Sequence, residues 1–497
     1  MRQDDPDPFS TASSSRPPGN QAERLWCKPR DWLLRQIEDG TLAPGERLPS
    51  LRDLSRLFGI SLNTARRAID DLVDTARVIT VPRSGYFVAE REPTVSALAL
   101  DGVDVRVDHK VVAMMEQARR DDLLPLASAV LSSSLVPTDL LGRCMRAVAR
   151  AQDSAAGFIP PPGDLELRRR IAGLMVRRGV DCTAEDVLVT AGDTVALELA
   201  LLALGRAGDC VIVEDPTYFG ILQAIEHVGM RAVPIRVGAD GIDLDQLAAA
   251  LRTRPPAAIF LNPTLQNPCG FVMSEASRLR LVELSTAAGV AIIEDDVFYD
   301  LLPEGRQVVP IKALAPGDVL YCSSFTKTVA PGYRVGWCLP GRHYSAVLAQ
   351  MHGRNLSVSS LPQAVLAEFL RRDYHGAHIA RLRGSFARSS AGFARLVSAR
   401  FPAGTRYQAP VGGFIHWVKL PATIDVETFH SEAEALGIAI AKGDIFSLGS
   451  AGSQSLRFCL SGPLDSEVTR ALIGLGALAE RLQGSRTPAN HKTTCID

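Results

Sequence analysis

The chain has 497 residues, of which 46% are hydrophobic and 22% charged, and its formal net charge is −1. This length predicts about three structural units, and the near-neutral total argues against a protein whose whole surface coats a polyanion. No run of about 18 apolar residues occurs, so no membrane span is predicted, and the acidic, proline-broken start is unlike a signal peptide. Nine cysteines without a Cys-x-x-Cys pair fit reduced thiols better than disulfides or zinc. We therefore expect a cytoplasmic protein.

The chain changes character along its length. Residues 1–20 are rich in Asp, Pro and Ser and are expected to be disordered. Residues 21–90 contain closely spaced helical patterns, and residues 91–124 mix apolar and charged pieces and predict a linker with some helical content. Residues 125–481 alternate strand-like and helical runs, and residues 482–497 predict a disordered tail.

Two short helices and a hairpin are predicted in the first of these folded segments. Ser50 can cap a helix with Asp53 completing a capping box, and Gly59 ends that helix. Ser61 opens a second helix after a short turn, and the apolar runs around Ser84-Gly85 predict a hairpin. Together these elements predict a winged helix-turn-helix.

Positive charge gathers at the start of the second helix. Between residues 47 and 67, five arginines stand against the single Asp53. Free amides at a helix start also favour phosphate. The residues predicted to contact DNA are Arg52, Ser61, Asn63, Thr64, Arg66 and Gly85. The alternative is a solvated helical hairpin with scattered charges.

Over about residues 28–90 the chain resembles the winged helix-turn-helix of GntR-family bacterial regulators. The resemblance rests on Gly45, Leu48-Pro-Ser50, Arg52-Asp-Leu54, Ser61, Thr64, Arg66 and Ser84-Gly-Tyr-Phe-Val88. It implies a double-stranded DNA operator as partner. Leu62 stands where the family usually carries arginine. Leucine cannot make a bidentate contact to guanine, so either the operator differs from the usual ones or specificity is relaxed.

From Leu126 onward, near-continuous apolar runs recur between helical segments. They cover residues 186–190, 210–214, 232–237, 257–261, 290–294, 319–322 and 335–338. Such runs predict a mostly parallel, seven-stranded sheet covered on both faces, an α/β fold. Ligands of these sheets gather beyond the carboxyl ends of the strands, where the polar motifs of this chain fall.

Lys327 follows one of these strands in a Ser-Ser-Phe-Thr-Lys loop, with Arg334 seven residues further on. Lysine condenses reversibly with a carbonyl to a Schiff base, and partial burial keeps its amine neutral. Pyridoxal phosphate is the cofactor that needs such a lysine beside an anion clamp. Taken alone, a solvated surface lysine is the more frequent case, and it is the neighbouring motifs that favour the cofactor.

Two motifs supply an anion site and a ring wall. Ala191-Gly-Asp-Thr194 enters a helix, so its free amides and the Thr194 hydroxyl can hold a phosphate. Asp193 is unusual there and is expected to cap the helix, with its amide rather than its carboxylate used on the ligand. Tyr218 can stack on a planar heterocycle, or can be a packed loop aromatic.

Three further motifs carry polar groups for a ring and a carboxylate. Asn267, held by Pro268, can donate to a phenolate oxygen. Asp296, with Tyr299 three residues later, can keep a protonated pyridine nitrogen charged, although Asp295 and Asp296 could both be turn acids. Arg457 in an apolar strand requires a carboxylate, either that of an amino acid or that of a structural salt bridge.

Over about residues 125–480 this series resembles the fold-type I aminotransferases, whose small C-terminal α+β subdomain is then expected here. The resemblance implies Lys327 as the Schiff-base lysine, Asp296 as the pyridine-nitrogen partner, Asn267 and Tyr299 at the ring oxygen, and Tyr218 as the stacking aromatic. It implies Asp193, Thr194, Ser324 and Arg334 at the phosphate and Arg457 at a substrate or effector carboxylate. Phe158 stands where the family often has a tyrosine that reaches the neighbouring subunit's phosphate.

A winged helix joined to an aminotransferase-like domain resembles the MocR subgroup of GntR regulators. The resemblance implies a homodimer that binds DNA and senses pyridoxal phosphate, a small amino-compound joined to it, or both. One alternative is an aminotransferase with an accessory DNA-binding domain. The other is a degenerate core that serves only as a dimer scaffold.

Overall fold

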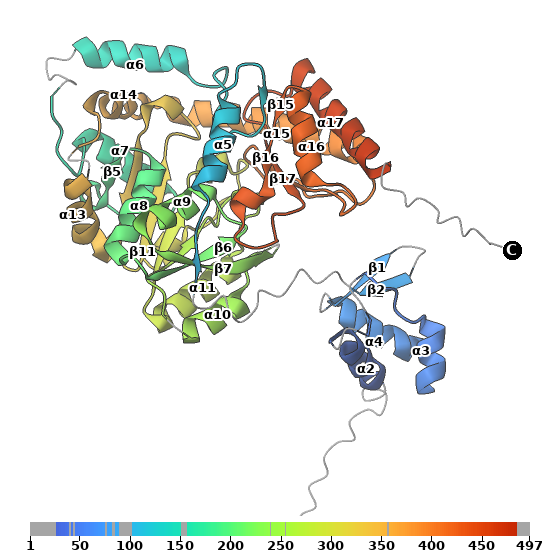
Figure 1. Cartoon of the computed structure of the whole chain (residues 1–497). Helices are drawn as coiled ribbons and strands as arrows, with labels where there is room; N and C mark the ends of the chain where they lie inside the picture. Colours follow the sequence, from blue (N-terminus) through green and yellow to red (C-terminus); the bar gives the residue numbers. More distant parts are fainter. Residues whose placement is uncertain are drawn as a thin grey trace, which may run out of the picture. The chain divides into compact units, whose positions relative to one another are not determined.

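The chain folds as two units, residues 1–94 and 95–497 (Figure 1). The computed structural model describes residues 26–484 apart from 39–40, 43–44, 75–76, 82–84, 89–101, 151–156, 239, 254 and 355–356. The segment 1–20 expected to be disordered and the wing residue Ser84 lie outside the described residues. The expected tail 482–497 lies outside them from residue 485 onward.

The first unit contains the predicted helix pair and hairpin. Its elements are α2 (Cys27–Glu38), α3 (Leu51–Phe58), α4 (Leu62–Asp74), β1 (Val78–Val81) and β2 (Gly85–Val88), with β1 and β2 antiparallel. Ser50 Oγ accepts a hydrogen bond from the Asp53 amide at 3.2 Å and donates to the Asp53 carboxylate at 2.5 Å. Gly59 ends α3 in the left-handed conformation, with φ of 62°. The apolar faces meet in a core that includes Leu33, Leu54, Ala65, Ile69 and Leu72.

The second unit is built on a nine-stranded sheet. Its strand order is β3-β7-β6-β9-β10-β11-β12-β5, with the short β8 paired to β7. The strands are β3 (Val103–Asp104), β5 (Leu188–Thr190), β6 (Cys210–Asp215), β7 (Arg231–Gly238), β8 (Gly241–Ile242), β9 (Ala258–Leu261), β10 (Ala291–Asp295), β11 (Val319–Ser324) and β12 (Gly336–Leu339). The neighbours from β7 to β11 are parallel, and β12 is antiparallel to both β11 and β5. All seven predicted strands belong to this sheet, and one of them, β5, lies at its edge.

Helices cover both faces of the sheet. One face packs on α8 (Asp193–Leu204), α9 (Phe219–Val228) and α13 (Tyr344–Arg354). The other packs on two groups: α10 (Leu244–Thr253), α11 (Glu275–Ala288) and α12 (Ile311–Leu314), and then α6 (Thr138–Arg150), α7 (Leu165–Arg177) and α14 (Ser360–Arg371). In the described part of the chain, no helix is both long enough and apolar enough to span a membrane.

A smaller α+β subdomain follows the sheet (Figure 1, orange to red). The long helix α15 (Tyr374–Arg400) leads into strands β13 (Arg406–Tyr407), β14 (Ile415–Lys419), β16 (Ala441–Lys442) and β17 (Ser455–Cys459), with α16 (Val426–Ala435) and α17 (Ser466–Gly484). These helices pack with β14 and β17 around Phe393, Phe429 and Phe458. Helix α17 continues two residues beyond the start of the expected tail.

Residues 103–124, expected as part of a linker, belong to the second unit. Strand β3 pairs with β7, and β4 (Leu124–Pro125) pairs with β15 (Ile438–Ala439). Between them, α5 (Asp108–Ala118) buries Val111 and Met114 in the same core as α8 and α9. The Glu226 carboxylate accepts from the amide that precedes α5 at 2.7 Å. A helix with so few buried apolar residues gives a weak sequence pattern, which explains the difference.

Candidate cofactor site and DNA-binding surface

Lys327 lies in the loop after β11, at the carboxyl end of the parallel strands. Its Nζ donates to the Ala129 carbonyl at 2.9 Å and lies 6.0 Å from the centroid of the Phe298 ring. Burial, and then the charge of Arg457, lower the pKa of Lys327 below its ordinary value. Because only the neutral amine attacks a carbonyl, these surroundings favour a nucleophilic lysine.

Gly192, at the N-terminus of α8, faces the guanidinium of Arg334. Gly192 has φ of 94°, and an added Cβ would lie 2.7 Å from Arg334 Nη2, so only glycine fits. Ser324 pairs across the sheet with Gly336, where an added Cβ would lie 2.6 Å from the Gly192 carbonyl carbon. The structure thus brings the first amides of α8, Arg334, Ser324 and Thr194 to one place, and this arrangement suits an anion.

Tyr218 immediately precedes α9 and lies beside the anion site at the start of α8. Its side chain is hydrogen-bonded to that of Thr194, and burial raises the pKa of Tyr218 to about 12. The charges of Asp193 and Asp295 also act on Tyr218. Its ring centroid lies 5.0 Å from that of Phe219. Tyr218 is therefore a neutral aromatic wall with its hydroxyl turned to the helix start.

Asp193 does not cap α8 as expected. Gly192 occupies the cap position, and Asp193 is the first residue of the helix. Its side chain is buried, and among the described residues Oδ1 has no hydrogen-bond partner. Burial raises the pKa of Asp193 to about 7, although Lys327 and Arg334 act to lower it. A carboxyl group whose neutral form is favoured by burial therefore lies beside the predicted phosphate position.

Asp295, rather than the predicted Asp296, is the carboxyl on the side of Lys327. Successive residues of a strand face opposite sides, and Asp295 shares its side of β10 with Ile293, which packs in the core beneath α8. Burial and the Asp193 charge raise the pKa of Asp295, and Lys327 lowers it. Asp296 instead accepts a hydrogen bond of 2.9 Å from the Tyr321 hydroxyl on the opposite side of the sheet. The two adjacent acids differ only in the side of the sheet that they face. The motif spacing does not report that side, and it selected the wrong acid.

The same one-residue offset places Tyr299 away from Lys327. Its hydroxyl donates to the Val308 carbonyl at 3.0 Å, and the Arg178 guanidinium lies 4.6 Å from the centroid of its ring. Phe298 is the aromatic residue beside Lys327. The structure therefore does not bring a Tyr299 hydroxyl to the predicted ring oxygen, because Asp295 and Phe298 are the pair with the expected spacing.

Arg457 is 1% exposed and crosses from β17 into the site. It donates through Nη1 to Asn267 Oδ1 at 3.1 Å and through Nη2 to the Ala127 carbonyl at 2.6 Å. Its guanidinium lies 4.5 Å from the centroid of the Phe446 ring, and Nε has no hydrogen-bond partner within the described residues. All these partners are neutral, so the structural salt bridge considered from the sequence is not formed within the described chain. The Oδ1 atom of Asn267 is therefore held by this arginine.

The start of α4 presents the predicted DNA contacts to solvent. Ser61 Oγ accepts from the Thr64 amide at 3.1 Å and lies 2.8 Å from Thr64 Oγ1, so these hydroxyls cap the helix. Leu62 is 49% exposed beside them. Gly85 in the hairpin has φ of 118°, and an added Cβ would lie 3.2 Å from Arg47 Nε. Of the predicted contacts, Arg52, Ser61, Asn63 and Arg66 are exposed. Thr64 and Gly85 are partly exposed.

Two family models match the chain. The model of bacterial regulatory proteins of the gntR family matches residues 30–88, and the model of aminotransferase class I and II matches residues 129–475. The HTH-type transcriptional regulator YdcR of Escherichia coli (strain K12) is 33% identical over 458 residues, which cover 90% of this chain and 97% of YdcR. The chain belongs to the MocR-type regulators of the GntR family.

One further relative and one solved structure are similar to this chain. The MocR protein of Rhizobium meliloti, named a probable rhizopine catabolism regulatory protein, is 28% identical over 367 residues, covering 71% of this chain and 73% of MocR. The solved kynurenine aminotransferase of Pyrococcus horikoshii aligns with a TM-score of 0.70 and 24% identity over 79% of this chain and 98% of that chain. That structure shows the fold alone. This MocR-type protein is thus a DNA-binding transcription regulator with an aminotransferase-like domain.

Pyridoxal 5′-phosphate is the cofactor of this domain. Bound there, it supplies an aldehyde and an electron-withdrawing pyridine ring. The residues present fit it: any side chain at Gly192 would close the space beside Arg334, and Lys327 is partly buried with a lowered pKa. Asp295 is 2% exposed with no ion pair within the described chain, so a protonated ring nitrogen would give it a counter-ion. Asp193 is the one acid beside the predicted phosphate position, and burial favours its protonated, neutral form.

Proposed function

We propose that this regulator senses an amino acid or related amino-compound through the cofactor at Lys327. The observation that carries this proposal is the buried Arg457, whose hydrogen bonds go only to neutral acceptors. A buried charge without a counter-ion is costly, and a ligand carboxylate would supply one bidentately. Because the Arg457 charge acts on Lys327, the two groups lie close enough for one small molecule to join them.

The roles of the remaining site residues follow from their positions. Thr194, Ser324 and Arg334, with the first amides of α8, would hold the phosphate. Asp295 would face the ring nitrogen in place of Asp296, and Tyr218 would flank the ring. Asn267 would act by orienting Arg457, since its Oδ1 accepts from that guanidinium.

The regulator would bind its operator through the start of α4 and the wing. Arg52, Asn63 and Arg66 are exposed and would contact phosphates or base edges. Ser61, Thr64 and Gly85 would bring backbone amides close to phosphate. The protein would act on chromosomal DNA and therefore in the cytoplasm.

The working form would be a homodimer. Phe158 is 72% exposed, which is unusual for a large aromatic residue, and it stands where related enzymes reach the neighbouring subunit. Two DNA-binding units would then meet two half-sites of an operator. Light scattering of the full chain measures the mass, and a monomer at micromolar concentration would contradict this assignment.

A gel-shift experiment tests the regulator and its response. The full chain is mixed with the DNA upstream of its own gene, without cofactor, with cofactor, and with cofactor plus each amino acid. We expect sequence-preferring binding whose affinity changes with the cofactor and with one class of amino acid. Equal affinity for upstream and unrelated DNA in every state would refute the proposal.

A second candidate function is transamination. It is favoured by the nucleophilic surroundings of Lys327 together with a buried carboxylate-binding arginine, which a half-reaction needs. Incubation of the cofactor-loaded protein with an amino-acid panel, followed by assay of keto acids, distinguishes the two. Formation of keto acid over multiple turnovers would support an aminotransferase. No keto acid with any donor would support sensing as the function.

A further inference from the structure

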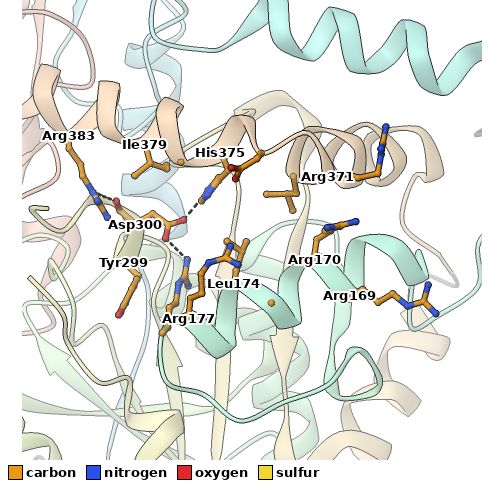
Figure 2. A pocket seen from close by; sticks show the side chains of 15 residues that line it. Arg169, Arg170, Leu174, Arg177, Tyr299, Asp300, Arg371, His375, Ile379 and Arg383 are labelled. Carbon is orange, nitrogen blue, oxygen red and sulfur yellow. Dashed lines mark hydrogen bonds and ion pairs between the residues drawn. The ribbon is translucent and has the colours of Figure 1, made fainter. Parts of the chain in front are cut away.

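A cavity of about 620 Å³ lies on the sheet face opposite Lys327. Figure 2 shows it between the carboxyl end of α7, the junction of α14 and α15, and Tyr299–Leu301. Its back wall contains the ion pair of Arg178 with Asp300, in which Nη2 lies 2.7 Å from Oδ1. Ligand cavities in proteins are typically about 300–1,000 Å³, so this one can hold a small molecule.

The cavity has an excess of positive charge. Six arginines line it: Arg169, Arg170, Arg177, Arg178, Arg371 and Arg383. They face four carboxylates, those of Asp300 and Asp373 in the lining and those of Glu166 and Glu368 paired to Arg170 and Arg371. Six charges against four leave two positive charges without a partner. An anion inside the cavity would complete the balance.

Two arginines on the wall remain available to a ligand, and a buried histidine lies behind them. Arg383 uses only Nε, which donates to the Asp300 carbonyl at 2.8 Å, and its terminal nitrogens are free within the described chain. Arg177 is exposed, and no ion pair engages it among the residues described. His375 is 9% exposed, and its Nε2 lies 3.3 Å from Asp300 Oδ2 without completing a hydrogen bond. In Figure 2 the side chains of His375 and Arg383 converge on Asp300.

The rest of the lining suits a phosphate attached to an organic group. Helix α15 begins at the cavity with Tyr374, and its cap residue Asp373 makes no side-chain cap bond, so the first amides are open. Leu174 and Ile379 give the lining an apolar portion. At Gly376 an added Cβ would meet nothing within 4 Å, so this side is open space. Guanidinium groups from three helices match the several acceptor oxygens of a phosphate.

We propose that this arginine cavity binds a small phosphate-bearing molecule, at a site separate from the cofactor site. The phosphate would accept hydrogen bonds from Arg177 and Arg383 at the start of α15, with its organic group against Leu174 and Ile379. Its back wall continues through Arg178 and Tyr321 to Asp296, the neighbour of the cofactor-facing Asp295. A ligand in the arginine cavity would therefore contact residues that are hydrogen-bonded to the end of β10, the strand that carries Asp295.

Calorimetric titration of the full chain, loaded with its cofactor, tests the site. The probes are adenosine 5′-monophosphate, inorganic phosphate and adenosine, in chloride buffer at low ionic strength. We expect the monophosphate to bind, and Arg177→Gln and Arg383→Gln each to weaken it by about tenfold to a hundredfold, the range for a charged hydrogen bond. Arg388→Gln, an exposed arginine of the same helix outside the cavity, should change affinity by less than about twofold.

Gly376→Met gives a second variant that does not remove charge. Because the position is helical and faces open space, methionine should fold normally and fill the cavity, which would abolish binding. Binding of inorganic phosphate as tight as that of the monophosphate would support the phosphate site with the free ion as its ligand. Adenosine binding as tightly as its monophosphate, or equal losses in Arg177→Gln and Arg388→Gln, would overturn the proposal. So would binding of duplex DNA to these arginines when no small phosphate binds.

Discussion

Asp193 should make cofactor affinity fall as pH rises. In the folded chain its pKa is about 7, raised from 3.8 chiefly by burial, while Lys327 and Arg334 act to lower it. The acidic neighbours Asp295 and Asp296 raise it further, and Tyr218 is neutral. A phosphate dianion bound beside this carboxyl would disfavour its charged form still more. Binding therefore takes up a proton once pH exceeds about 7.

The magnitude follows from linkage. Above a pKa of about 7 in the free protein, each pH unit should weaken binding by up to about tenfold, until the pKa of the complex is reached. The titration of Lys327 has the opposite effect on cofactor affinity, because the fraction of neutral, reactive amine grows with pH. Asp193→Asn removes the first effect and keeps the second. The difference in slope between wild type and Asp193→Asn, up to about one logarithmic unit of Kd per pH unit, is therefore the quantity to measure.

Titrations of the cofactor-free chain, followed by the visible absorbance of bound cofactor from pH 6.5 to 9, supply these slopes. Asp121→Asn, an exposed aspartate of the same unit, is the control and should follow wild type. The same variant has a stability signature. A folded pKa above the unfolded value means that wild type loses stability as pH rises from about 4 to about 7, by on the order of 4 kcal/mol, and Asp193→Asn should not. Parallel slopes in wild type and Asp193→Asn would refute the placement of this carboxyl beside the phosphate.

Five other substitutions test the remaining assignments. Lys327→Ala should abolish the visible band and the adduct trapped by borohydride, as mass spectrometry of the digested chain would show. Arg457→Met should leave cofactor affinity within about threefold yet weaken an amino-acid effect by about tenfold to a hundredfold, because one charged bidentate contact is lost. Asp295→Asn should shift the absorbance of bound cofactor, and Asp296→Asn should mainly lower Tm; the reverse pattern would restore Asp296 as the ring partner. Leu62→Arg should increase preference for guanine at one operator position, measured by binding selection from random duplexes, and an unchanged preference would show that this residue does not face a base.

The main features of the fold could be predicted because they depend on long patterns. All seven apolar runs became strands, since a strand covered on both faces needs an uninterrupted apolar sequence. The cap at Ser50 and the helix end at Gly59 were also confirmed, because each depends on one side chain and its immediate neighbours. The structure of residues 103–124 was harder to predict. The start of α5 is stabilised by Glu226, a residue distant in sequence, and no local pattern reports such a contact.

The site was less predictable because roles depend on the direction of single side chains. Lys327 and Arg334 lie in loops and Gly192 at a helix start. Gly192 contacts Arg334, and both Arg334 and Lys327 act on Asp193, the residue that follows it. The choice between Asp295 and Asp296 depends on which side of the sheet carries α8, and this is a property of the assembled sheet. The choice of Asp296 also led to the choice of Tyr299, because the aromatic residue was selected by its spacing in sequence from the acid.

The acids near the end of β10 show why Asp295 is left for a ligand. Glu294 accepts two backbone amides, at 2.9 and 2.8 Å, from the start of α12, and Asp296 accepts the Tyr321 hydroxyl. Asp300 is paired with Arg178 at 2.7 Å, and Arg178 and His375 hold the pKa of Asp300 well below its ordinary value. Asp295 receives only a long bond of 3.4 Å from the Val297 amide, and its pKa is raised. Burial also raises the pKa of Glu294 and Asp296, but within the described chain Asp295 alone of these four carboxyls has neither an ion pair nor a short hydrogen bond. A positive charge that enters from the Lys327 side, such as a protonated ring nitrogen, would stabilise its carboxylate.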